Sequence, residues 1–404
     1  MATTTFDSSL PRQSLNSGPV GLALTLIVLG AGYLSIAVTW RQGALFLVGA
    51  GAGVALYHAA FGFTFAWRTM IVEGRGGGLR AQMLMLAVTC AVFLPLLAHG
   101  QIFGHRVHGS VSPVSLSVIA GAFLFGMGMQ LGDGCASGTL YAAGGGSVRM
   151  LVTLAAFIVG SVIGALHMPF WQAAPAFQPI SLLSRLGLAA SLGVSLLLFG
   201  AVALASLIVE RRRHGSLVDR AAALAKNPVA RREGSAWLIG PWPLVAGALS
   251  LAAVNIATLV LAGRPWGITS AFALWGSKVL AALGVGVAAW PYWQPAGNAA
   301  ALRESVFSDI TSVMDIGILL GALMAAGLAG RFAPFWRVPT KSLLAAVIGG
   351  LMLGYGARIA YGCNIGAFFS GVSSSSVHGW LWFVAAFAGN GVGTRIRPLF
   401  GLRV

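Results

Sequence analysis

Long apolar runs separated by short polar or basic segments recur along the whole chain. They cover residues 20–38, 44–60, 81–98, 115–129, 151–167, 186–209, 237–262, 271–289, 313–328, 343–360 and 380–389. A run of about 20 apolar residues is long enough to cross a bilayer as a helix. The pattern therefore predicts an all-α, polytopic integral membrane protein with roughly nine to eleven crossings, some of them joined by short broken helices.

Composition removes the soluble alternatives. Of the 404 residues, 57% are hydrophobic and only 8% are charged, whereas soluble domains carry about a quarter charged residues. The net charge of +16 comes from basic residues in short segments between apolar runs, which is where cytoplasmic loops of membrane proteins carry them. We therefore expect a location in the cell (inner) membrane, a lipid bilayer as surroundings, and no nucleic-acid partner.

One basic segment divides the chain into two membrane parts. Residues 210–236 contain Arg211, Arg212, Arg213, Arg220, Lys226, Arg231 and Arg232, and the positive-inside bias places such a segment in the cytoplasm. We predict a polar tail over residues 1–18, a first membrane half over 19–209, this linker over 210–236, and a second membrane half over 237–404. The tail lacks the basic start and apolar core of a cleaved signal peptide.

Two glycine–cysteine segments share one spacing, and this spacing predicts that the two halves are related. Every matched position differs by 228, and the pairs are Gly121 and Gly349, Gly126 and Gly354, Gly128 and Gly356, Gly134 and Gly362, Cys135 and Cys363, and Gly138 and Gly366. A weaker echo relates residues 61–64 to residues 266–269. A repeat of this kind fixes the architecture as two pseudo-symmetric halves.

Glycine-rich breaks inside apolar helices have a specific meaning in a membrane. Each glycine lowers helix stability by about 1 kcal/mol, and the backbone groups that it frees must face protein or a wet cavity. Two such breaks related by a repeat point to a central substrate site. Short helices that begin there direct N–H groups at the site and favour an anion. The number of intervening crossings decides whether the repeats are parallel or inverted, and the sequence leaves this open.

Cys135 and Cys363 are the first candidates for substrate contact. Both directly follow a glycine at equivalent positions of the repeat. A thiol is a weak hydrogen-bond donor with a polarisable sulfur, so it can hold a soft sulfur-bearing anion without the cost of desolvating a fixed charge. Cys90 lies in a plain apolar run and is interpreted as a packing residue. No pair of cysteines forms a CxxC motif.

The other candidates surround these cysteines. Glycines shape the backbone of the breaks: Gly134, Gly138, Gly362 and Gly366. The amide of Asn364 is a candidate lining group of a polar vestibule. Asp133 and Arg358 are the charged residues of the two motifs, and two interpretations stay open for them. They neutralise each other across the repeat interface, or Arg358 attracts an anion.

We expect neither a cofactor nor a metal. His99, His105 and His108 do not have a helical metal-binding spacing. The chain has no phosphate-cradling Walker loop, so transport would be passive or ion-coupled. Few carboxylates lie near apolar segments, and a proton relay has little support: Asp133, Glu304, Asp309 and Asp315.

At these residues the sequence resembles the YeeE/YedE family of sulphur-transport proteins, whose characterised members are thiosulfate permeases. The resemblance rests on Gly134-Cys135-Ala136-Ser137-Gly138 and on Gly362-Cys363-Asn364-Ile365-Gly366, with residues 61–68 similar to the family's first motif. It implies a pseudo-symmetric membrane fold with a narrow constriction. There, Cys135 and Cys363 would pass thiosulfate inward by S–H hydrogen bonds. It also implies a small cytoplasmic sulfur carrier of the TusA type as a partner.

One departure from the family pattern concerns a third cysteine. The permeases carry it in the first motif, where this chain has Gly62. The hypothesis is therefore a permease that imports a small sulfur-containing anion, thiosulfate first, with sulfite or sulfide as alternatives. A membrane thiol–disulfide enzyme is a further alternative, and it predicts that the two cysteines cross-link on oxidation. A scaffold without a pathway is disfavoured, because it has no use for a broken polar centre.

Overall fold

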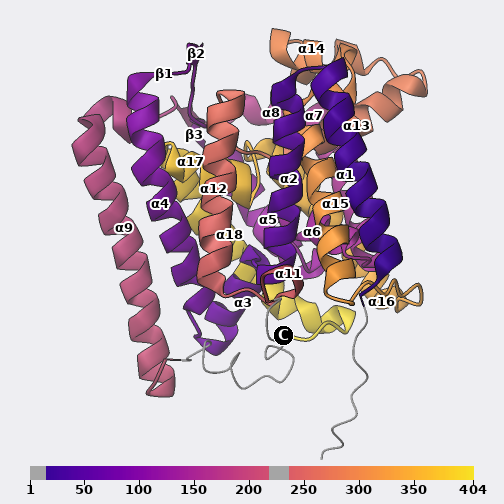
Figure 1. Cartoon of the computed structure of the whole chain (residues 1–404). Coiled ribbons are helices and arrows are strands. Elements are labelled where there is room, and N and C mark those ends of the chain that lie inside the picture. The colour runs from indigo at the N-terminus through magenta and orange to yellow at the C-terminus, as the bar shows by residue number, and fades with distance from the viewer. Residues whose placement is uncertain (1–14, 218–235) are drawn as a thin grey trace, which may run out of the picture.

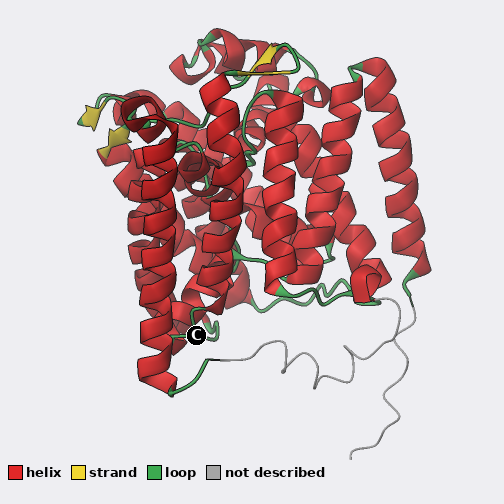
Figure 2. Cartoon of the chain, turned by 60° about the vertical axis from the view of Figure 1, so that its left-hand side comes forward, coloured by secondary structure: helices red, strands yellow, loops and turns green. Residues whose placement is uncertain are grey.

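The structure is a computed structural model, and it describes residues 15–217 and 236–404. Long helices stand side by side and form most of the molecule (Figure 1). After rotation the same bundle is seen, with short strands confined to one end (Figure 2). Most of the predicted tail and most of the predicted linker lie outside the described residues.

The first part of the chain holds nine helices of very different length. They are α1 (Ser17–Ala37), α2 (Trp40–Ala59), α3 (Phe63–Glu73), α4 (Gly77–His99), α5 (Leu116–Gly132), α6 (Ala136–Gly144), α7 (Val148–Leu166), α8 (Met168–Gln172) and α9 (Leu182–His214). Two small antiparallel pairs of strands join some of them, namely β1 (Gln101–Ile102) with β2 (His105–Arg106), and β3 (Val114–Ser115) with β4 (Ala176–Phe177). Helix α9 continues to His214, so it extends into the range predicted as linker.

The second part begins with α11 (Ala236–Ile239) and ends near the C-terminus with α18. The remaining helices are α12 (Leu244–Ala262), α13 (Thr269–Ala282), α14 (Ala296–Arg303), α15 (Ile310–Leu328), α16 (Thr340–Ile359), the π-helical η5 (Asn364–Phe369), α17 (Ser370–Ser373) and α18 (Val377–Ile396). Short 3-10 turns complete it: η2 (Val287–Ala289), η3 (Pro291–Trp293), η4 (Val306–Ser308) and η6 (Arg397–Phe400).

The helices confirm an all-α, polytopic membrane protein. Within the described residues, nine candidate spans have the length and composition to cross a membrane. Helix α18 is not one of these nine spans. It has 20 residues and stands beside them in the bundle, but polar residues such as Asn390 interrupt its apolar sequence. Two predicted runs are shorter than expected. Helix α12 starts only at Leu244, after Pro241 and Pro243, and α13 has only 14 residues, since Gly284 and Gly286 follow it.

The same order of elements occurs in both parts of the chain. A long helix, a break, a short helix and two long helices are followed by a second break, a short helix and a long helix. These are α2 to α7 in the first part and α12 to α18 in the second, with α14 inserted. The two series run in opposite directions. The N–H of Trp242, before α12, donates to the carbonyl of His58, near the end of α2, over 2.8 Å.

Glycine contacts between the helices follow the same relation. Where α5 crosses α16, a Cβ atom on Gly121 would lie 2.7 Å from the Gly356 carbonyl oxygen. A Cβ atom on Gly128 would lie 2.9 Å from the Gly349 carbonyl oxygen. The offset of 228 maps the first pair onto the second, in reverse order. Small residues allow membrane helices to approach this closely, and a reciprocal crossing is what two halves of opposite orientation require.

Candidate functional site

Three of the short helices that follow a break are preceded by a residue with extended backbone, whereas Ile268 before α13 has φ −127° and ψ −54°. Cys135 precedes α6, with φ −87° and ψ −172°, and Cys363 precedes η5, with φ −103° and ψ −167°. Gly62 occupies the corresponding position before α3, with φ −129° and ψ 135°. The two cysteines are therefore placed alike, at the N-termini of short helices. Gly62 holds the third such position without a thiol.

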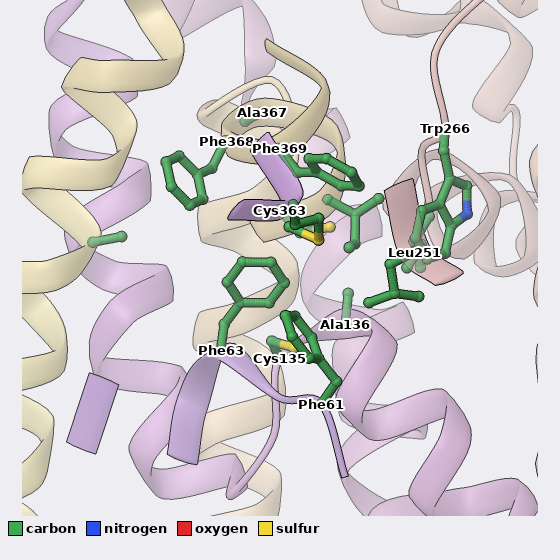
Figure 3. Packing of buried hydrophobic residues seen from close by; sticks show 14 of the residues in the cluster. Phe61, Phe63, Cys135, Ala136, Leu251, Trp266, Cys363, Ala367, Phe368 and Phe369 are labelled. Carbon is green, nitrogen blue, oxygen red and sulfur yellow. The ribbon is translucent and has the colours of Figure 1, made fainter. Parts of the chain in front are cut away.

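The two cysteines lie in one buried cluster. Both thiols are free, and each cysteine is only 1% exposed. Helix α6 contacts η5, which brings the two breaks together at the centre of the bundle. Figure 3 shows both sulfur atoms among the aromatic rings of Phe61, Phe63 and Phe369. We call this buried cluster of thiols and aromatic rings the constriction.

A backbone N–H group at the start of α6 points at the sulfur of Cys135. The Gly138 N–H donates to Cys135 Sγ over 3.4 Å, and the Ser137 hydroxyl lies 3.4 Å from the same sulfur. Cys363 has the equivalent position before η5, but its sulfur makes no capping hydrogen bond there. Helix N-termini carry a partial positive charge, so both thiols lie where an anion is stabilised.

The glycines of the two motifs make room for this backbone. Gly362 has φ +147°, and a Cβ atom there would lie 2.8 Å from the Ala367 nitrogen. Gly134 and Gly138 are less constrained, because added Cβ atoms would lie no closer than 3.3 Å and 3.4 Å to their neighbours. Gly366 faces Gly267 of the other break, whose Cα is 3.9 Å from the added Cβ position. Gly362 is the position at which only glycine fits.

We expect Gly362→Ala to destabilise the protein by about 1–3 kcal/mol, because alanine is strained at that backbone angle and meets the Ala367 nitrogen. The measurement is the melting temperature of the purified protein in detergent. Gly267→Ala is the matched control, because it lies in the neighbouring break with nothing within 4 Å of the added Cβ. Equal melting temperatures for both variants would refute this account of Gly362.

A pocket of about 250 Å³ opens beside the Cys363 break, at the end of the bundle to which α12 and α16 lead. We call it the vestibule, and its lining consists of His108, Gly109, Ser110, residues 264–270, Arg358, Tyr361, Gly362 and Gly366. Two arginines are present, and none of the described residues that line it is acidic. The pocket floor includes Gly362, the residue directly before Cys363, so an anion in the vestibule would lie next to the constriction.

Arg358 contributes its guanidinium group to the vestibule. Its Nη1 donates to the Tyr292 hydroxyl, and its Nη2 donates to the Thr269 carbonyl over 3.0 Å. The guanidinium carbon also lies 5.2 Å from the centre of the Tyr292 ring. The buried Nε of Arg358 has no partner among the described residues. Arg264 is fixed nearby, since its Nη2 donates to the Thr311 hydroxyl over 3.1 Å.

Two interpretations were open for Asp133 and Arg358, and the one in which they neutralise each other is wrong. Asp133 ends α5 and lies between three arginines: its carboxylate is 3.1 Å from Arg68, 3.9 Å from Arg149 and 2.9 Å from Arg397. Helices α5 and α16 are antiparallel, so Asp133 and Arg358 lie at opposite ends of the crossing. The three arginines and one carboxylate leave a net positive charge beyond the constriction, on the far side from the vestibule.

Asn364 directly follows Cys363 and is fully buried. Neither its side-chain oxygen nor its side-chain nitrogen has a hydrogen-bond partner among the described residues. A buried amide without partners costs about 1–3 kcal/mol unless a ligand or water satisfies it. Asn364 is thus a polar group available at the constriction rather than a residue of the vestibule.

The structure brings together most of the residues predicted from the sequence. Cys135, Cys363 and Asn364 meet at the constriction, and Arg358 lies just outside it. Cys90 packs in the core, where its sulfur lies 3.8 Å from the Val372 carbonyl. Three arginines that the sequence had not singled out lie on either side of these residues: Arg149, Arg264 and Arg397. Each lies beside a break or follows the last helix, a position that hydropathy alone does not distinguish from an ordinary loop.

Broken helices that meet at a buried polar centre, with cationic groups on both sides, define a multi-pass membrane protein of the transporter class. The chain belongs to the Sulphur transport family, whose model matches residues 58–392. The match covers both cysteine motifs and the two vestibule arginines. Of the three arginines around Asp133, it covers all but Arg397.

Similar proteins have been named as transporters rather than enzymes. Over 173 residues the chain is 31% identical to "Probable transporter YedE" of Escherichia coli (strain K12), an alignment that covers 42% of each protein. Over 352 residues it is 24% identical to "Thiosulfate transporter TsuA" of the same organism, covering 85% of this chain and 91% of that protein. Over 77 residues it is 43% identical to "Thiosulfate transporter TsuA" of Spirochaeta thermophila, 23% of that protein. The chain thus spans less than half the length of the YedE relative that it matches.

Proposed function

We propose that this protein is a permease that imports a small sulfur-containing anion, thiosulfate first, through the interface of its two inverted halves. The observation that carries the proposal is the pair of buried thiols, Cys135 and Cys363, at the N-termini of two facing short helices. They lie beneath a vestibule that contains Arg264 and Arg358 and no described acidic residue. The relatives named as thiosulfate transporters support the choice of substrate.

The chemistry of the constriction suits a soft anion. Neutral thiols donate weak hydrogen bonds and are polarisable, so they stabilise a sulfur-bearing anion without binding it permanently. Backbone N–H groups at the two helix N-termini add positive potential, and the unpartnered amide of Asn364 offers a further donor. The substrate would pass from the vestibule to Cys363, then to Cys135, and then to the arginines around Asp133.

The orientation of the protein in the membrane follows from the distribution of charge. The last turn of α9 lies at one end of the bundle and carries Arg211, Arg212 and Arg213. The positive-inside bias places that end in the cytoplasm, and the vestibule then faces outward from the inner membrane. We further propose that a small sulfur carrier of the TusA type accepts the substrate on the cytoplasmic side, which the resemblance to the YeeE/YedE family supports.

Uptake of radiolabelled thiosulfate into proteoliposomes tests the proposal. Cys135→Ser and Cys363→Ser should each reduce uptake at least about tenfold, because a hydroxyl is a less polarisable group than a thiol and is a shorter one. Cys90→Ser is the matched control, because Cys90 is buried outside both breaks. Unchanged uptake in both motif variants would rule out a thiol pathway. If the parent takes up no thiosulfate, labelled sulfite and sulfide are tested next, since Gly62 removes one thiol position.

A further inference from the structure

Asp315 is a carboxyl group buried in the membrane-spanning helix α15. Its relative exposure is 0%, and both of its side-chain oxygens lack a hydrogen-bond partner among the described residues. An ionised carboxylate without a partner is costly to bury, both in a protein interior and in a bilayer. A carboxyl group in these surroundings is stable in its protonated, uncharged form.

Its place on α15 connects it to the pathway. Residues four apart lie on one face of a helix, so Thr311, Asp315 and Leu319 follow each other along one side of α15. Thr311, one turn before Asp315, accepts from Arg264 over 3.1 Å and lies 3.0 Å from the Ser270 hydroxyl, both of which line the vestibule. One turn after Asp315, the Leu319 carbonyl packs against Gly144, the last residue of α6.

Asp315 is also connected to the constriction through the packing of its helix. Helix α15 contacts α6, which begins directly after Cys135, and α6 contacts η5, which begins directly after Cys363. Asp309, the N-cap residue of α15, is satisfied, because it accepts from the Ser312 N–H over 2.8 Å and from the Ser312 hydroxyl over 2.6 Å.

No positive group among the described residues forms an ion pair with Asp315. The elements that pack against α15 carry these titratable side chains: Arg41, Tyr57 and His58 of α2, Tyr141 of α6, Lys278 of α13, Tyr33 of α1, and Arg264 before α13. The three lysine and arginine side chains are engaged elsewhere, and Arg41 lies over the Trp40 ring. Lys278 donates to the carbonyls of Leu302 and Glu304, and Arg264 donates to Thr311. None of these described groups makes a hydrogen bond or an ion pair with Asp315.

We propose that Asp315 is the proton-binding group of this transporter and that one proton enters with each anion. The inference rests on the proposed function. An anion at Cys363 and an ionised carboxylate at Asp315 would repel each other strongly in a medium of low dielectric, so the anion binds when Asp315 is protonated. By reciprocity, the anion makes Asp315 bind its proton more tightly.

The proton is conserved through the cycle and no electron moves. A proton from water in the vestibule adds to the Asp315 carboxylate as the anion reaches Cys363. When the anion leaves past Cys135, the same proton returns to water on the far side. The structure then corresponds to the protonated, closed form, which has no charge at the centre of the membrane.

The test uses full-length protein in proteoliposomes with labelled thiosulfate outside and a pH-sensitive dye inside. In the parent, thiosulfate should acidify the interior, and a gradient of about one pH unit, acidic outside, should raise accumulation about tenfold. Asp315→Asn should lose both responses but keep exchange of labelled for unlabelled thiosulfate, because asparagine is uncharged, as a protonated aspartate is. Asp309→Asn is the matched control and should behave as the parent, since asparagine also caps helices.

Thiosulfate uptake by the parent without proton movement would overturn the inference, as would proton-coupled uptake by Asp315→Asn. If the parent transports no sulfur anion, the proposed function fails, and a second measurement still tests Asp315. Infrared difference spectra of the purified protein between acidic and alkaline buffer should contain a carboxylic acid band that Asp315→Asn lacks. The absence of that band from the difference spectrum of the parent would show that Asp315 does not exchange its proton between the two buffers, and it would overturn the inference by itself.

Discussion

Replacing Arg358 by glutamine is expected to reduce thiosulfate uptake at low substrate concentration about a hundredfold. The guanidinium group lies in the vestibule next to Gly362, its Nε has no described partner, and two further donors are already fixed by Tyr292 and Thr269. A hydrogen bond to a charged group contributes about 1.5–3 kcal/mol, and about 2.7 kcal/mol corresponds to a hundredfold. Glutamine keeps polar contacts but removes the charge.

The dependence of uptake on thiosulfate concentration separates capture from passage. We expect the KM to rise and the maximal rate to change little, because Arg358 lies before the constriction rather than in it. Arg303→Gln is the matched control, since Arg303 is an exposed cation at the end of α14. A fall in the maximal rate with an unchanged KM would contradict a role in capture, and so would an equal effect of Arg303→Gln.

Replacing Gly354 by valine is expected to destroy most of the folded protein. A Cβ atom at Gly354 would lie 2.1 Å from the Phe157 carbonyl oxygen, so α16 and α7 would have to separate. Overpacking of a tight core typically destabilises a protein by about 1–3 kcal/mol. We expect a destabilisation at or above the upper end of this range, because the added side chain meets backbone atoms, which cannot turn aside as a flexible side chain can. The measurement is the fraction of monodisperse protein after extraction in a mild detergent.

Gly51→Val provides the control for this loss. Gly51 is exposed on α2, and nothing lies within 4 Å of its added Cβ. Valine has the same effect on helix propensity at both sites, so the difference between the variants reports the contact of α16 with α7. A Gly354→Val protein that extracts and elutes as well as Gly51→Val would show that this crossing tolerates a wider spacing.

Hydropathy was sufficient for the membrane helices and failed where proline or glycine interrupts them. The run at residues 237–262 looks continuous, yet α12 starts at Leu244 because Pro241 and Pro243 precede it. The run at residues 271–289 becomes the 14-residue α13, since Gly284 and Gly286 end it. Apolar composition reports burial in the membrane or the bundle, whereas the length of a helix depends on backbone groups that hydropathy does not count.

The candidate site was only partly predictable for a similar reason. The spacing of Cys135 and Cys363 placed them at equivalent breaks, and the structure brings them together at the centre. The pairing of Asp133 with Arg358 failed because it needed the relative direction of α5 and α16, which depends on an exact count of crossings. Asp315 was one of four carboxylates of equal standing in the sequence. Only its position on α15, without any described partner, distinguishes it.

The opposite orientation of the two series of helices has a consequence for whether the anion can cross the membrane in both directions. A substrate that arrives from either face meets a break, a short helix with its N-terminus towards the centre, and a thiol, in the same order. Under the proposed function the constriction would therefore be no one-way valve, and the gradients of the anion and the proton across the membrane would set the sign of net flux. A cell that accumulates the anion faster than it consumes it would lose the excess through the same protein, which makes rapid consumption in the cytoplasm a condition for sustained uptake.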